Sequence, residues 1–113
     1  MNTKITLYYK EGCYYCDIFR PTWEKLKSLL KCKNIKYEEY EKHKNNSKII
    51  KNNIKIFPTI KIKKGNNVYD YNGVRSVDAI MNDLTDNNYE SKYNKYKKKY
   101  LTKKYLLGGG DKH

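Results

Sequence analysis

KITLYYKEGCYYCDIFRPTWEKLKSLL, residues 4–30, places an alternating apolar segment, two cysteines and an amphipathic segment in direct succession. The alternation over residues 4–9 predicts a β-strand with two partly buried faces. Four large apolar residues then recur at helical spacing: Phe19, Trp23, Leu26 and Leu30. This spacing predicts a helix over residues 16–30. We expect Pro21 to kink that helix, because its ring removes one intrahelical hydrogen bond.

The cysteine pair Cys13-Tyr14-Tyr15-Cys16 stands where the predicted strand gives way to the helix. Two cysteines three positions apart at a helix start lie close enough for a disulfide to open and close. The helix N-terminus offers unpaired N–H groups and a partial positive charge, which favour a thiolate at Cys13. We therefore interpret the pair as a catalytic dithiol: Cys13 attacks a disulfide, and Cys16 resolves the mixed disulfide.

Length and hydropathy set the class of protein. With 113 residues, the chain has room for one small domain and a modest extension. It contains no apolar run long enough to span a membrane, and its first residues are too polar for a signal peptide. We expect a cytoplasmic protein that is not secreted, in a compartment where stable structural disulfides are uncommon.

The formal charge of +13 invites comparison with nucleic-acid-binding proteins. Lys, Asn, Tyr and Ile, however, supply 59 of the 113 residues, and all four are encoded by codons made largely of A and T. An A/T-rich genome would raise the lysine content of any protein. Because basic charge alone gives only non-specific affinity, the composition does not predict nucleic acid as a partner.

The remaining pattern of the first 86 residues predicts alternating elements. Strands are expected over residues 35–41, 59–63 and 68–71, with a hairpin turn at residues 65–67. Ser47 is the expected N-cap of a short helix ending at Asn52, and Ser76 the N-cap of a helix reaching Leu84. Connections through helices imply parallel neighbours and hairpins antiparallel ones. We predict an α/β domain with a mixed four-stranded sheet and helices on both faces.

Composition changes after residue 86, so we divide the chain into a domain of residues 1–86 and a tail of residues 87–113. The tail carries eight lysines against Glu90 and Asp111. Four of its five tyrosines recur at heptad-like spacing, at positions 89, 93, 96 and 100. We expect a basic, Tyr/Lys-rich helix that ends at three consecutive glycines, residues 108–110.

Metal binding is the main chemical alternative for the cysteine pair. Cys32, His43 and His113 are the other cysteine and histidine residues, and their spacing matches no common zinc module. We therefore predict no bound metal.

The cysteine pair and a second motif, Phe57-Pro58-Thr59, together resemble the thioredoxin-fold family. Pro21 stands where thioredoxins and protein-disulfide-isomerase domains keep a helix-kinking proline. Residues 19–26 (FRPTWEKL) and 71–75 (YNGVR) resemble the isomerase domains in particular. The resemblance covers about residues 4–86.

The resemblance implies a thiol–disulfide oxidoreductase that acts on protein dithiols and disulfides without a resident cofactor. Pro58 would be cis and face the cysteine pair, and the backbone of Phe57 would bind an extended substrate peptide. Gly73 would lie at the rim of the substrate groove. Tyr14, Tyr15 and Thr59 complete the expected substrate-binding residues.

Other features are similar to the glutaredoxins, whose length the domain shares. Lys10, three residues before Cys13, would there contact a carboxylate of glutathione as co-substrate, and Tyr15 precedes the second cysteine. A glutathione-dependent glutaredoxin is therefore an alternative, as are a non-catalytic binding module and an iron–sulfur carrier. The Tyr14-Tyr15 pair matches none of the common intervening pairs, so no redox direction is assigned.

The tail resembles the C-terminal tails of many proteins of giant DNA viruses. With the Lys/Asn/Tyr/Ile bias, this suggests a viral gene product found in the host cytoplasm and the virion. A packaging signal or a self-association segment is a hypothesis for residues 87–113.

Overall fold

The elements of the domain follow the predicted order β-α-β-α-β-β-α. The computed structural model describes residues 2–86; the basic helix expected within residues 87–113 lies outside the described residues. In chain order the elements are β1 Thr3–Tyr9, α1 Tyr14–Cys32, β2 Lys36–Glu41, α2 Asn46–Lys51, β3 Thr59–Lys64, β4 Asn67–Asp70 and α3 Val77–Thr85.

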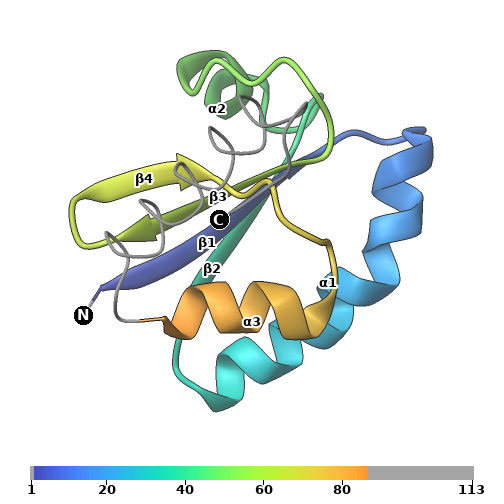
Figure 1. Cartoon of the computed structure of the whole chain (residues 1–113). Coiled ribbons are helices and arrows are strands. Elements are labelled where there is room, and N and C mark those ends of the chain that lie inside the picture. Colours follow the sequence, from blue (N-terminus) through green and yellow to red (C-terminus); the bar gives the residue numbers. More distant parts are fainter. Residues whose placement is uncertain (1, 87–113) are drawn as a thin grey trace, which may run out of the picture.

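The four strands form one mixed sheet in the order β2-β1-β3-β4 (Figure 1). β1 runs parallel to β2, with Leu7 opposite Glu39, and antiparallel to β3, with Leu7 opposite Ile60. β3 and β4 form an antiparallel hairpin whose turn contains Gly65 at φ +61°. The predicted mixed sheet is confirmed, and β1, which leads into the cysteine pair, is one of its two central strands.

The main core lies on one face of this sheet. Ile5 and Leu7 of β1 face the same side as Ile60 and Ile62 of β3, as the two-residue period of a strand requires. α1 and α3 cover this face with residues at helical spacing: Phe19, Trp23, Leu26, Leu30, Ile80, Met81 and Leu84. On the opposite face, α2 packs Ile49 against Tyr8 near one end of the sheet.

α1 begins two residues earlier than the apolar spacing predicts, at Tyr14, and ends at Cys32. Cys13 is its N-cap, and the Cys13 Sγ accepts a hydrogen bond from the Cys16 backbone N–H at 3.2 Å. This contact satisfies one of the N–H groups that a helix start leaves unpaired. Pro21 lies inside α1, and Figure 1 shows that the helix bends along its length, as expected for an internal proline.

The predicted cap of α2 is wrong and that of α3 is confirmed. α2 begins at Asn46, so Ser47 lies inside it and Asn45 is the N-cap. The Asn45 side chain instead accepts a hydrogen bond from the Glu41 backbone N–H at 3.0 Å, which closes the turn before α2. At α3 the Ser76 Oγ accepts from the Ala79 N–H at 3.1 Å, in the usual geometry of a serine cap.

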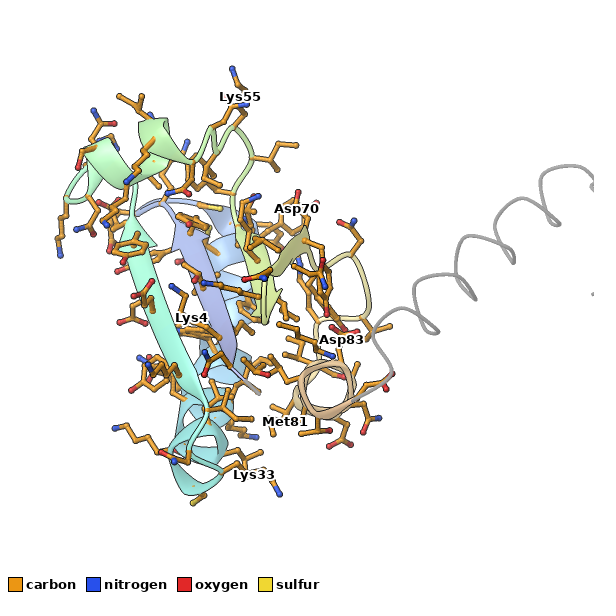
Figure 2. The ribbon with its side chains drawn as sticks, turned by 90° about the vertical axis from the view of Figure 1, so that its left-hand side faces the viewer. Lys4, Lys33, Lys55, Asp70, Met81 and Asp83 are labelled. Carbon is orange, nitrogen blue, oxygen red and sulfur yellow. The ribbon has the colours of Figure 1, made fainter. Side chains whose placement is uncertain are left out.

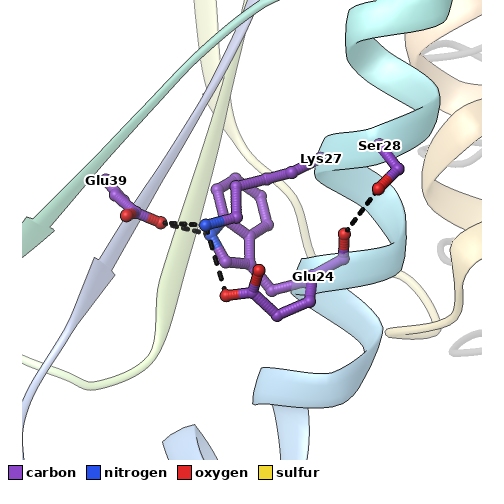
Figure 3. Close-up of polar contacts among 5 residues, drawn as sticks. Glu24, Lys27, Ser28 and Glu39 are labelled. Carbon is purple, nitrogen blue, oxygen red and sulfur yellow. Dashed lines mark hydrogen bonds and ion pairs between the residues drawn. The ribbon is translucent and has the colours of Figure 1, made fainter.

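Two sets of polar contacts fix the helices to the sheet. The Glu39 carboxylate of β2 accepts from the Trp23 Nε1 at 2.6 Å and from the Lys27 Nζ at 3.1 Å, so α1 is tied to β2 (Figure 3). Lys64 of β3 is only 4% exposed; its ammonium donates to the carbonyls of Asp83 and Asp86, at the C-terminal end of α3. Figure 2 labels Asp83 on α3, which lies end-on in that view.

Candidate active site

Cys13 lies at the junction between β1 and α1, half-buried at the helix N-terminus. Gly12 precedes it with φ +78°, a conformation in which a side chain would be strained, and this residue turns the chain into the helix. The Cys13 thiol accepts from the Cys16 N–H and lies 3.6 Å from the Phe57 carbonyl oxygen, to which it donates. A backbone N–H and the N-terminal end of α1 therefore face the Cys13 sulfur.

Cys16 lies behind Cys13, within the first turn of α1, and only 4% of it is exposed. Burial, followed by the side-chain hydrogen bond with Cys13, raises the pKa of the Cys16 thiol from 9.0 to about 11. A backbone hydrogen bond from Lys10 acts in the opposite direction without cancelling the rise. At neutral pH, Cys16 is accordingly a protonated thiol shielded from solvent, whereas Cys13 is the accessible sulfur.

The loop between α2 and β3 brings Pro58 beside the cysteine pair. The Phe57–Pro58 peptide bond is cis, as the resemblance implies, and Pro58 shares a small pocket with Cys16. Thr59 donates its hydroxyl hydrogen to the Ile56 carbonyl at 2.5 Å, which closes the loop at the start of β3. The Phe57 carbonyl thus points at the Cys13 sulfur from a loop 44 positions away in sequence.

A second loop, residues 71–75, supports the first. The Arg75 guanidinium donates to the Pro58 carbonyl at 3.3 Å, and the Tyr71 hydroxyl donates to the Val74 carbonyl at 2.5 Å. Gly73 lies under the Tyr71 ring: a Cβ there would stand 2.7 Å from the Tyr71 hydroxyl oxygen. A side chain at position 73 would therefore displace Tyr71. Gly73 is exposed and belongs to the loop that contacts Pro58.

A buried carboxylate holds the loop that precedes Cys13. Glu41, at the end of β2, is 2% exposed and accepts from the backbone N–H groups of Glu11 (3.0 Å), His43 (2.7 Å) and Lys44 (2.8 Å). Burial alone would raise the pKa of Glu41, but these backbone hydrogen bonds outweigh it and lower the pKa. Sequence reasoning missed this residue; its only signal is a single acid at the end of a strand, before a polar turn.

Exposed apolar side chains directly follow Cys13 in the sequence and also lie on the two loops just described. Tyr14 and Tyr15 are 70% and 62% exposed, and their rings make an edge-to-face contact with centroids 5.2 Å apart. Ile56 and Val74, from the two loops just described, are 73% and 70% exposed. We call these four residues the apolar rim.

The other sequence-predicted residues are less closely joined to the site. Lys10 is half-buried and forms no ion pair with any residue that the structure describes. Cys32 is exposed at the far end of α1. Over residues 2–86, no three His, Cys, Asp or Glu side chains come together as a metal site.

This geometry agrees with what the comparisons with known proteins found. The family model "Thioredoxin" matches residues 2–86. The chain belongs to the thioredoxin family. The thioredoxin domain is similar to the first thioredoxin domain of mouse protein disulfide-isomerase A4, with 27% identity and a TM-score of 0.62 over 74% of this chain and 61% of that one.

Two further solved structures share the fold of this thioredoxin domain. The first two thioredoxin domains of Naumovozyma dairenensis Eps1p match at 24% identity and a TM-score of 0.63, over 71% of this chain and 32% of that one. Human ERp44 matches at 17% identity and a TM-score of 0.65, over 72% and 23%. The chain therefore spans less than two thirds of the length of the structures that it matches.

Family membership and the Cys13–Cys16 pair support a thiol–disulfide redox role for this thioredoxin domain. None of its described helices is long and apolar enough to cross a membrane.

Proposed function

We propose that this chain is a thiol–disulfide oxidoreductase that exchanges its Cys13–Cys16 dithiol with disulfides of protein substrates. The observation that carries the proposal is the asymmetry of the pair: the Cys13 sulfur is accessible and faces the Cys16 N–H, whereas the Cys16 thiol is buried behind it. An attacking sulfur must reach the substrate, and a resolving sulfur must reach only its neighbour.

The reaction consists of two exchanges. The Cys13 thiolate attacks one sulfur of the substrate disulfide, the substrate S–S bond breaks, and the departing sulfur leaves as a thiolate that takes up a proton. Cys16 then loses its proton and attacks the Cys13 Sγ. The Cys13–Cys16 disulfide forms as the bond from Cys13 to substrate breaks. Two electrons pass from the domain to the substrate, and the reverse sequence oxidises a substrate dithiol.

The apolar rim and the loop of residues 56–59 support protein rather than small-molecule substrates. The apolar rim presents four exposed apolar side chains, two that follow Cys13 in α1 and two from the loops that contain Phe57 and Arg75. An extended peptide laid along the Phe57 backbone would place its apolar side chains against this rim, in the manner of strand addition. Glutathione has no comparable apolar side chains.

Reduction of insulin by dithiothreitol in the presence of the protein tests the proposal, because precipitation of the insulin B chain reports cleavage of a protein disulfide. Cys13→Ser should abolish the reaction, and Cys16→Ser should trap a mixed disulfide that survives non-reducing electrophoresis. Cys32→Ser, at the exposed third cysteine, is the matched control and should retain activity.

The alternatives give different results in the same experiment. Reduction of a glutathione mixed disulfide that persists in Cys16→Ser, with no insulin reduction by the wild type, would replace the proposal with a glutaredoxin function. Full biological function of Cys13→Ser would indicate a binding module. Visible absorbance after anaerobic purification would indicate an iron–sulfur carrier.

A further inference from the structure

The face of the sheet opposite α1 and α3 carries a basic hollow of about 230 Å³. Side chains from all four strands and from α2 line it, and neither Cys13 nor Cys16 is among them. Its position follows from strand alternation: Lys4, Thr6 and Tyr8 of β1 point away from the core formed by Ile5 and Leu7. We call this surface the open sheet face.

Lysines dominate the open sheet face. The hollow is lined by five lysines: Lys4, Lys48, Lys51, Lys61 and Lys63. Two carboxylates accompany them: Glu38, which also lines the hollow, and Asp70, which forms an ion pair with Lys61. Figure 2 labels Lys4 and Asp70, the latter at the end of β4.

Two of the five lysines have their charge compensated. Lys4 pairs with Glu38 at 3.2 Å and Lys61 with Asp70 at 2.6 Å. Lys48, Lys51 and Lys63 form no ion pair with any residue of the described range 2–86. Five lysines against two carboxylates leave three positive charges on a concave surface, and such a surface attracts polyanions.

An aromatic ring lies among these charges. Tyr40 is half-buried, with its ring centroid 5.8 Å from that of the buried Tyr8 and 5.5 Å from the Lys48 Nζ. Tyr40 also lines the hollow, and the part of its side chain that stays exposed offers an aromatic contact to a bound group. Proteins that bind single-stranded nucleic acid combine these two elements: a cationic groove for the phosphates and aromatic rings for the bases.

We propose that the open sheet face binds single-stranded nucleic acid, as a function separate from the redox site. The charge of the other candidate occupants argues against them. A second copy would bring the same excess of lysine, and residues 87–113 of this chain carry eight lysines against two acids. The net charge of the chain did not predict nucleic acid as a partner, because a bias toward A/T-rich codons explains the high lysine content. The placement of three lysines without an ion pair around one hollow that contains an aromatic ring is a separate observation.

The test uses the full chain and a fluorescent single-stranded oligonucleotide of about 12 nucleotides, within the usual site size of such surfaces. Fluorescence anisotropy would be measured for the wild type, for K48Q/K51Q/K63Q, and for K25Q/K31Q/K33Q. The last variant loses the same charge from exposed lysines at and near α1. Both variants should keep insulin reductase activity, since none of these lysines belongs to the redox site.

We expect K48Q/K51Q/K63Q to weaken binding by about tenfold or more and to reduce the slope of log affinity against log salt by about 2, as for three lost phosphate contacts. The control variant should stay within about twofold of wild type. Equal weakening in both variants would overturn the proposal, because net charge alone would then explain binding. Equal or tighter binding of a poly-glutamate peptide or a duplex oligonucleotide through the same three lysines would also overturn it.

Discussion

Raising the pH should accelerate the second step of the proposed reaction, in which Cys16 displaces the substrate from Cys13. A thiol with a pKa of about 11 is only about 0.01% thiolate at pH 7, and this fraction rises tenfold per pH unit. In the mixed disulfide the hydrogen bond from the Cys16 thiol to the Cys13 thiol is lost, while burial remains, so the pKa of Cys16 lies between 9.0 and about 11. We therefore expect the rate to rise about 50- to 100-fold between pH 7 and pH 9.

Stopped-flow absorbance measures this step directly. When Ellman's reagent reacts with the reduced protein, Cys13 forms a mixed disulfide with thionitrobenzoate, and attack by Cys16 then releases a second thionitrobenzoate. The second phase should not depend on reagent concentration and should be absent in Cys16→Ser. A rate that levels off below pH 8 would refute the reasoning, because Cys16 would then ionise more readily than an ordinary exposed thiol, whose pKa is 9.0.

Further predictions concern stability in urea or heat. Because the folded protein raises the pKa of Cys16, the protonated thiol contributes stability that is present below pH 9 and is lost as the pH rises toward 11. The reduced wild type should therefore lose more stability between pH 9 and pH 11 than Cys16→Ser does. Gly73→Ala should lower the free energy of unfolding by about 1 kcal/mol, because the new side chain displaces the Tyr71 hydroxyl from its hydrogen bond. In a Tyr71→Ala background the same substitution should leave the free energy of unfolding unchanged. Leu26→Ala, at a fully buried position, should cost about 2–5 kcal/mol in urea unfolding. Burial alone would raise the pKa of Glu39, but hydrogen bonds from α1 lower it, so the stability that this carboxylate contributes is lost as the pH falls below about 4.5. Glu39→Gln should therefore have a lower melting temperature than the wild type at about pH 7. The difference between the two melting temperatures should shrink toward about pH 3.

Local patterns in the sequence predicted most of the helices and strands of the fold. The strand at residues 3–9, the helix with Trp23 and Leu26 on its buried face, and the Ser76 cap each depend on residues within a few positions of one another. The start of α1 was misplaced because cysteine is not a usual N-cap; its thiol takes that role here only because Cys13 lies against the Cys16 N–H.

The site depends more on contacts between distant residues, and these were harder to predict. The motif around Pro58 indicated its nearness to the cysteines through family resemblance, not through spacing. The contact of Glu41 with the Glu11 backbone joins positions 30 apart and involves a carboxylate that alone looks like any surface acid. The Gly73–Tyr71 contact requires knowledge of where a side chain folds back. The virion hypothesis for residues 87–113 stays a prediction.

The burial of Lys64 gives this lysine-rich chain an internal reporter. Its ammonium group is held by carbonyls at the end of α3, so amine-reactive reagents should modify it far more slowly than the exposed lysines around it. When α3 leaves the sheet, that protection ends. Mass spectrometry after a short acetylation pulse would therefore follow the detachment of a single helix in the native protein. The measurement needs no engineered probe and leaves the cysteine pair unchanged.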